Sequence, residues 1–195
     1  IINRGGTILK TARCLEFKTK EGQAIALKHL RENEIDGLVV IGGDGSFAGA
    51  QVLTDYGIPA IGIPGTIDND LAYTDYTLGF DTALNTQVRY IDGMTDTGLA
   101  MPGRVFFVET LGAWDGYLAH SSVLMGMADF SVMVEKPMSN EEICLKVKKL
   151  IENPKKDYVL VTFAEGTYQT IEAANYVREK LGLNVKCNLL GFTQR

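Results

Sequence analysis

The chain has little of what membrane, secreted and nucleic-acid-binding proteins carry. No apolar run in its 195 residues reaches the roughly 18 residues that a membrane-spanning helix needs. Its three cysteines, Cys14, Cys144 and Cys187, are odd in number and lack metal-ligand spacing, which favours a reduced compartment. Lysine and arginine number 19 against 24 acidic residues and form no basic tract for nucleic acid. We therefore expect a cytoplasmic protein that binds neither nucleic acid nor a membrane.

Glycine, in contrast, is abundant, and many of the 21 glycines punctuate an alternation of apolar runs and amphipathic stretches. This alternation predicts a doubly wound α/β fold. Strands are expected at 37–41, 60–63, 104–109, 130–134, 158–163 and 185–190, and helices at 21–33, 47–56, 79–93, 117–126, 140–152 and 171–181.

Three local features refine this pattern. The β-branched runs at 37–41 and 60–63 predict fully buried strands. Ser139 with Glu142 predicts a capping box at the start of a helix. The segment 95–103, with Gly98, Pro102 and Gly103, is expected to form a hinge between two lobes.

Two glycine-rich loops follow the first two predicted strands. In the first, residues 42–46, glycines let backbone N–H groups approach an anion at the start of a helix. Asp44 there would repel a phosphate but suits Mg²⁺. In the second, residues 64–70, Asp68 or Asp70 can take a proton from a substrate hydroxyl during phosphoryl transfer. The first loop alone could be a plain turn, but neighbouring parallel strands bring such loops to one crevice, so the pair predicts a phosphoryl-transfer site.

Six motifs in order carry a family resemblance. They are Gly5-Gly6-Thr7-Ile8 with Ala12-Arg13, residues 42–46, residues 64–70, residues 74–80 with Thr82-Ala83, residues 108–112, and Leu190-Gly191 with Gln194-Arg195. On these motifs the chain resembles the bacterial, ATP-dependent type of 6-phosphofructokinase over essentially its whole length. Since the sequence opens on Ile1 rather than Met, we expect a part of a longer chain, without the family's N-terminal strand and glycine loop and without its C-terminal return to the first lobe.

The resemblance implies a fold and an activity. The fold is two doubly wound α/β lobes, each a three-layer sandwich with a mostly parallel sheet: a larger ATP-binding lobe including residues 1–79, a smaller sugar-phosphate lobe at 80–193, and the start of a return at 194–195. The activity is glycolytic transfer of the γ-phosphoryl group of ATP, with Mg²⁺, to the 1-hydroxyl of fructose 6-phosphate. The resemblance also implies a homotetramer with nucleotide effector sites between subunits.

The same resemblance assigns roles to residues. Asp68 matches the catalytic base, with Thr66 and Gly112 beside the transferring phosphoryl group, and Asp44 matches the Mg²⁺ partner. Nucleotide contacts are expected from Arg13, Cys14, Gly43, Asp44, Gly45 and Ser46, substrate contacts from Thr66, Ile67, Asp68, Arg104, Leu111, Gly112, Glu165, Lys186 and Arg195, and effector contacts from Asp129, Lys155 and Lys156. Arg104 and Lys186 are expected to reach the site from a neighbouring subunit. A solvated helix face is the favoured interpretation of the two effector lysines, and effector binding is the alternative.

The sequence indicates the phosphoryl donor more clearly than the acceptor. Pyrophosphate-using relatives carry larger, charged residues where Gly45 and Gly65 stand, so ATP is the expected donor. Four positions depart from the family pattern: Ala113 and Thr95 replace arginines, Phe192 replaces a histidine, and Lys186 replaces a bridging arginine. Trp114, Asp115 or a neighbouring lysine could compensate for the lost groups. The alternatives that stay open are a weakly active or regulatory paralogue, a kinase for a different sugar phosphate, and a NAD or lipid kinase, which the second loop disfavours.

Overall fold

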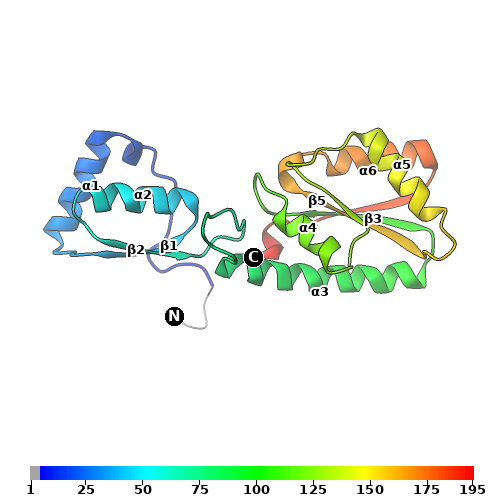
Figure 1. Ribbon diagram of the computed structural model, residues 1–195, viewed down its shortest axis with the longest axis horizontal. Helices are drawn as coiled ribbons and strands as arrows, with labels where there is room; N and C mark the ends of the chain where they lie inside the picture. The colour runs from blue at the N-terminus through cyan, green and yellow to red at the C-terminus, as the bar shows by residue number, and fades with distance from the viewer. Residues whose placement is uncertain (1–4) are drawn as a thin grey trace. The chain divides into compact units, whose positions relative to one another are not determined.

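Alternating apolar runs and glycine turns build α/β units on either side of Ile63, where the computed structural model divides the chain in two. The structure describes residues 5–195. Each unit is considered by itself, and Figure 1 labels the helices and strands of both. Within the described residues, no helix is both long enough and apolar enough to cross a membrane.

The first unit contains two strands and two α-helices. Its elements are η1 (Glu16–Lys18), α1 (Lys20–Glu32), β1 (Leu38–Gly42), α2 (Asp44–Asp55) and β2 (Ala60–Pro64). Strands β1 and β2 pair in a two-stranded sheet. The ring of Phe47 on α2 packs onto Gly62 so closely that a Cβ there would lie 2.9 Å from it. Helix α2 therefore rests on one face of this sheet.

The prediction that both of these strands are fully buried is wrong. Val39 and Ile41 of β1 and Ile61 of β2 are 64–68% exposed, while their neighbours Leu38 and Val40 are half-buried. Alternate side chains of a strand point to opposite faces. The exposed residues alternate with those that pack inward, so one face of the two-stranded sheet is left uncovered by the described residues.

The second unit is built on a four-stranded parallel sheet with the strand order β4-β5-β3-β6. Its elements are α3 (Leu78–Ala100), β3 (Arg104–Thr110), α4 (Tyr117–Leu124), β4 (Phe130–Val132), α5 (Asn140–Ile151), β5 (Tyr158–Ala164), η2 (Glu165–Thr167), α6 (Thr170–Leu181), β6 (Asn184–Leu189) and η3 (Gly191–Gln194). The expected α/β class with a parallel sheet is confirmed.

Helices cover both faces of this sheet (Figure 1). Phe107 and Phe163, with ring centroids 4.8 Å apart, face the buried side chains of α5 and α6. Phe106 and Leu160 face Ile91 of α3 on the other side. A strand buried on both faces is typically a nearly continuous apolar run. β3 and β5 supply such runs, with Thr162 as a buried polar exception in β5.

The expected hinge at 95–103 is also wrong in its first part, because α3 continues as far as Ala100. Gly98, read as a breaker, instead allows close packing, since a Cβ there would lie 2.6 Å from the ring of Tyr158. The capping box is confirmed: the Ser139 hydroxyl accepts a hydrogen bond from Glu142 N at 3.2 Å, and the Glu142 carboxylate accepts one from Ser139 N at 2.8 Å.

Candidate active site

The first glycine-rich segment is the start of a helix rather than a loop. Gly43 is the N-cap of α2, so Asp44, Gly45 and Ser46 form the helix's first turn, three residues earlier than predicted. The N–H groups of a first turn lack helical partners and attract anions. A Cβ placed on Gly45 would meet no atom within 4 Å, so the surface around this turn is open. Arg13 and Cys14 are exposed and precede η1 in the same unit.

The second glycine-rich loop is fastened to the N-terminus of α3. The hydroxyl of Thr77, the N-cap residue, donates to Thr66 O at 2.7 Å, and Thr77 N donates to Asn69 Oδ1 at 2.9 Å. Asn69 adopts a left-handed conformation with φ 59° and also donates from Nδ2 to Asp75 O at 3.2 Å. Asp68 N donates to Thr66 Oγ1 at 3.1 Å. These bonds fix the backbone on both sides of Asp68.

The carboxyl ends of the parallel strands gather several other predicted site residues. Thr110 of β3 pairs with Ala164 of β5, so the residues that follow them, Leu111 and Glu165, lie at the same edge. Glu165 Oε1 accepts hydrogen bonds from Gly112 N at 3.2 Å and from Ala113 N at 2.9 Å. Gly112 has φ 138°, a conformation that favours glycine. Glu165 therefore holds the turn after β3 in shape.

Arg195 lies after β6 and η3. Its guanidinium carbon is 4.5 Å from the ring centroid of Phe192, within the range of a cation–π contact. Its positive charge also acts on Asp68, since it lowers the pKa of that carboxyl group. The phenylalanine that replaces the family's histidine thus stacks on a predicted substrate residue.

Carboxylates dominate the electrostatics of this edge. Burial raises the pKa of Asp68, and the like charges of Asp70 and Glu165 raise it further, against the opposing effects of Thr66 and Arg195. Burial also raises the pKa of Asp115 to about 7, opposed by the hydrogen bond from Tyr117 N and reinforced by Asp68, Asp70 and Glu135. Such perturbed carboxyl groups at a strand edge are typical of catalytic sites.

The raised pKa of Asp115 predicts a pH-dependent stability. The ordinary pKa is 3.8 and the folded one is about 7, so between these values the folded state holds a proton that the unfolded state has released. Stability then falls as pH rises through this window. Asp115→Asn removes the effect, so its thermal midpoint should gain on wild type between pH about 4 and about 7. The exposed Asp75→Asn is the control, and a pH-independent difference for Asp115→Asn would contradict the expectation.

Two predicted substrate residues lie away from this edge. Arg104 is the first residue of β3, six residues and about 20 Å before its carboxyl end. Lys186 of β6 is paired with Phe106, the third residue of β3, and is exposed. Within the described chain these two residues are therefore not brought to Asp68, and their expected donation to a neighbouring subunit's site stays a prediction.

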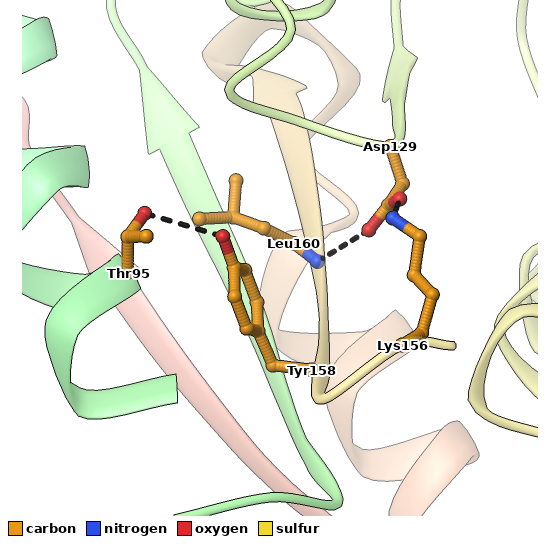
Figure 2. Close-up of polar contacts among 5 residues, drawn as sticks. All are labelled: Thr95, Asp129, Lys156, Tyr158 and Leu160. Carbon is orange, nitrogen blue, oxygen red and sulfur yellow. Dashed lines mark hydrogen bonds and ion pairs between the residues drawn. The ribbon is translucent and has the colours of Figure 1, made fainter. Parts of the chain in front are cut away.

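The predicted effector residues lie at the amino ends of the strands. The Asp129 carboxylate forms an ion pair with Lys156 and accepts a hydrogen bond from Leu160 N at 2.9 Å (Figure 2). Thr95 Oγ1 accepts a hydrogen bond from the Tyr158 hydroxyl at 3.4 Å. Burial lowers the pKa of Lys156. Two of the three predicted effector residues thus contact one another directly.

This ion pair should matter for stability because the Asp129 side chain is only 7% exposed. Lys156→Met leaves its carboxylate without a cation, and we expect the free energy of unfolding to fall by about 1–3 kcal/mol. The adjacent, exposed Lys155→Met is the matched control and should change it by less than about 0.5 kcal/mol. Urea unfolding of both variants gives the comparison, and equal effects would show that the pair contributes nothing.

The residues present fit a magnesium ion that is held mainly by substrate phosphates and water, with one carboxylate from the protein. In residues 5–195 no group of three or more histidine, cysteine, aspartate or glutamate side chains could hold a metal. Magnesium is commonly bound through one or two carboxylates together with substrate phosphates and water. The exposed Asp44, at a helix N-terminus suited to phosphates, fits that arrangement.

Sequence reasoning missed several residues that shape the site. Asn69 and Thr77 fasten the Asp68 loop, and Glu135 accepts a hydrogen bond from Gly116 N at 2.8 Å beside Asp115. Asp115 was expected only as a possible compensation for Ala113, and its burial and raised pKa could not be predicted from the sequence. Asn69 and Thr77 are eight residues apart, and no periodic pattern connects them.

The phosphofructokinase family profile matches residues 1–195. The chain is 48% identical over 195 residues to the ATP-dependent 6-phosphofructokinase of Clostridioides difficile and 45% identical over 197 residues to that of Alkaliphilus metalliredigens. In both comparisons the whole chain is covered, and it spans 60% of the relative's length.

Solved structures show the same fold. Phosphofructokinase of Pichia pastoris in the T-state matches with a TM-score of 0.85 and 31% identity, over 98% of this chain and 24% of that one. The pyrophosphate-dependent phosphofructokinase of Marinobacter aquaeolei matches with a TM-score of 0.77 at 23% identity, over 97% of this chain and 52% of that one. From sequence, site geometry and fold together, this chain belongs to the phosphofructokinase family.

Proposed function

We propose that the protein containing this chain transfers the γ-phosphoryl group of ATP to the 1-hydroxyl of fructose 6-phosphate, giving fructose 1,6-bisphosphate. The observation that carries this is the 48% identity, over the whole chain, to a relative named as an ATP-dependent 6-phosphofructokinase. The open surface at Gly45 supports ATP as the donor, because a larger residue there would occupy that space. Gly65, the second position at which pyrophosphate-using relatives carry a larger, charged residue, also supports ATP.

Asp68 is the proposed general base. Its backbone is fixed through Thr66 and Asn69, and its raised pKa makes it a better proton acceptor than an ordinary aspartate. It would take the proton of the 1-hydroxyl as that oxygen attacks phosphorus. Thr66 and Ile67 in the same loop are the proposed contacts to the reacting groups.

The turn after β3 and the end of the chain are proposed to bind the sugar phosphate. Glu165 keeps Gly112 and Ala113 in place and can accept a hydrogen bond from a sugar hydroxyl. Leu111 is proposed as a further contact from the same turn. Arg195 offers a cation to the substrate's phosphate. Arg104 and Lys186 would serve the site of a neighbouring subunit in a homotetramer.

The nucleotide is proposed to bind at the N-terminus of α2, through Gly43, Gly45 and Ser46. Arg13 and Cys14, from the exposed segment before η1, are proposed as further contacts. Asp44 would hold a magnesium ion there, and that ion would neutralise charge on the phosphates. We propose two doubly wound lobes. Residues 1–79 and 194–195 would belong to the larger, ATP-binding lobe, and residues 80–193 to the smaller lobe that binds the sugar phosphate. The protein would be a cytoplasmic enzyme of glycolysis.

Nucleotide effectors are proposed to bind at Asp129, Lys155 and Lys156. An anionic effector would compete with Asp129 for Lys156, because these two side chains are already paired. The replacement of an expected arginine by Thr95 leaves one cation fewer at that site.

A substrate panel tests the proposed function. The intact protein is assayed with ATP or pyrophosphate as donor and with fructose 6-phosphate, other hexose phosphates, NAD⁺ and diacylglycerol as acceptors. The proposal expects the highest kcat/KM with ATP and fructose 6-phosphate. A higher kcat/KM with any other combination of donor and acceptor would contradict the proposed function.

Ala113 favours a second candidate, a weakly active or regulatory phosphofructokinase. Its side chain cannot stabilise the transferring phosphoryl group as the family's arginine would, and one charge-assisted bond is worth about 1.5–3 kcal/mol, roughly ten- to a hundredfold in rate. Ala113→Arg with Phe192→His should then raise kcat/KM by about tenfold or more. Lys149→Met, an exposed residue of α5 with no proposed role, is the control. An unchanged or lower rate in the double variant would show that the natural residues already support full activity.

A further inference from the structure

A chain of buried amide and hydroxyl groups runs through the core behind the candidate site. Gln87 on α3 and Gln194 on η3 are fully buried. Gln194 Nε2 donates to Gln87 Oε1 at 2.7 Å. Gln87 Nε2 in turn donates to Leu118 O at 3.0 Å and to the hydroxyl of Ser122, both on α4. Four groups from three elements are thereby linked.

This hydrogen-bonded chain of Gln87, Gln194, Leu118 and Ser122, here called the relay, also reaches the turn after β3. Gln194 Oε1 accepts a hydrogen bond from Leu111 N at 2.9 Å. Strand β6 ends at Leu189, and Leu190 N still donates to Glu109 O at 3.1 Å. Beyond that point no strand of the described sheet follows β3 on this side, and the side chain of Gln194 supplies the acceptor that a strand backbone would have supplied.

The hydrogen bond between Gln194 and Leu111 connects two segments that carry proposed substrate contacts. Gln194 immediately precedes Arg195, and Leu111 immediately precedes Gly112. We propose that Gln194, supported by Gln87, is a positioning residue that holds Arg195 and the Leu111–Gly112 turn in register for the sugar phosphate. This inference rests on the proposed function, because it takes Arg195 and Gly112 as substrate contacts.

The chemistry of the amide explains why glutamine suits both positions. A buried backbone N–H without an acceptor is costly, and an apolar residue at 194 would leave Leu111 N in that state. A glutamine accepts at Oε1 and donates at Nε2. Each of the two glutamines can therefore hold one partner through its oxygen and another through its nitrogen. Among the described residues, no buried side-chain nitrogen or oxygen lacks a partner, which fits a relay that is complete at both ends.

The test compares two buried substitutions in the intact protein. Gln194→Met keeps the volume but removes both bonds, and we expect the KM for fructose 6-phosphate to rise about tenfold. The KM for ATP should stay unchanged. Thr162→Val is the matched control, because it removes another fully buried hydrogen bond of the same sheet, from Thr162 Oγ1 to Ala119 O at 2.8 Å. It should lower the thermal midpoint without changing either KM.

A double-variant cycle separates the relay from general destabilisation. Gln87→Met should raise the same KM less than Gln194→Met does, and combining the two should add little, because they interrupt one path. Multiplicative effects of the two variants, or an equal rise of KM in Thr162→Val, would overturn the inference.

Hydrogen exchange gives a readout that needs no substrate. The peptide containing Leu111 should exchange faster in Gln194→Met than in wild type and Thr162→Val. Unchanged exchange would overturn the relay even in an active enzyme. If wild type fails to phosphorylate fructose 6-phosphate, the proposed function fails and the positioning role falls with it, whereas faster exchange would still confirm the structural link at Leu111.

Discussion

Asp68→Asn is expected to lower kcat by about 10²- to 10⁴-fold, the usual contribution of a general base. The asparagine keeps the shape of the side chain and cannot accept a proton. Because the loop is held by Thr66, Asn69 and Thr77, its geometry should survive the change. The KM for fructose 6-phosphate should therefore change much less than kcat.

Asp75→Asn is the matched control for this prediction. Asp75 lies in the same connection between β2 and α3, and its side chain is exposed. The substitution should leave kcat within about twofold. Steady-state rates for wild type and both variants, measured with both substrates saturating, give the comparison. If the two variants lost activity equally, the loop as a whole and not the Asp68 carboxylate would be responsible.

Gly79→Ala should be the most damaging conservative change in α3. A Cβ at this position would lie 2.5 Å from Gly65 O and 2.6 Å from Thr66 O. Both are backbone atoms, and the second also accepts the hydrogen bond of Thr77, so the loop itself would have to shift. We expect the free energy of unfolding to fall by about 1–3 kcal/mol. Displacement of Asp68 should lower kcat by about a hundredfold.

Gly93→Ala in the same helix is its control. No atom lies within 4 Å of a Cβ there, so the alanine is expected to stabilise the helix by about 0.5–1 kcal/mol and leave kcat unchanged. Thermal midpoints and kcat values of the two variants check this contrast. Similar behaviour of the two alanines would mean that the contact between Gly79 and residues 65–66 is not important.

Features set by neighbours in sequence could be predicted from sequence. The capping box at Ser139 and Glu142 depends on spacing, and the parallel strands β3 and β5 depend on nearly continuous apolar runs. The positions of Leu111 and Glu165 at one strand edge follow from the same alternation of strands and helices.

Features set by distant residues could not. Gly98 was read as a breaker because its partner, the ring of Tyr158, is sixty residues away in sequence, and the contact that requires a glycine is invisible locally. The bond between Gln87 and Gln194 joins residues 107 apart. The exposure of Val39 and Ile41 depends on which elements cover β1, which an apolar run does not specify.

The candidate site shows the same division. Asp68 and Gly112 were found through local motifs and a family resemblance, and the structure supplies the bonds that hold them. The raised pKa of Asp115 depends first on burial and then on the charges of Asp68, Asp70 and Glu135, and residues distant in sequence supply both. The expected convergence of the α2 N-terminus and the Asp68 loop on one crevice stays a prediction.

Phosphorus NMR of a reaction mixture tests the central claim most directly. The intact protein is incubated with ATP, Mg²⁺ and fructose 6-phosphate, and with Asp68→Asn in parallel. The account predicts that wild type forms ADP and a second sugar phosphate monoester, at carbon 1, in equal amounts, and that the variant forms neither at a comparable rate. A wild-type protein that forms no such product from ATP, or an Asp68→Asn variant as fast as wild type, would contradict it.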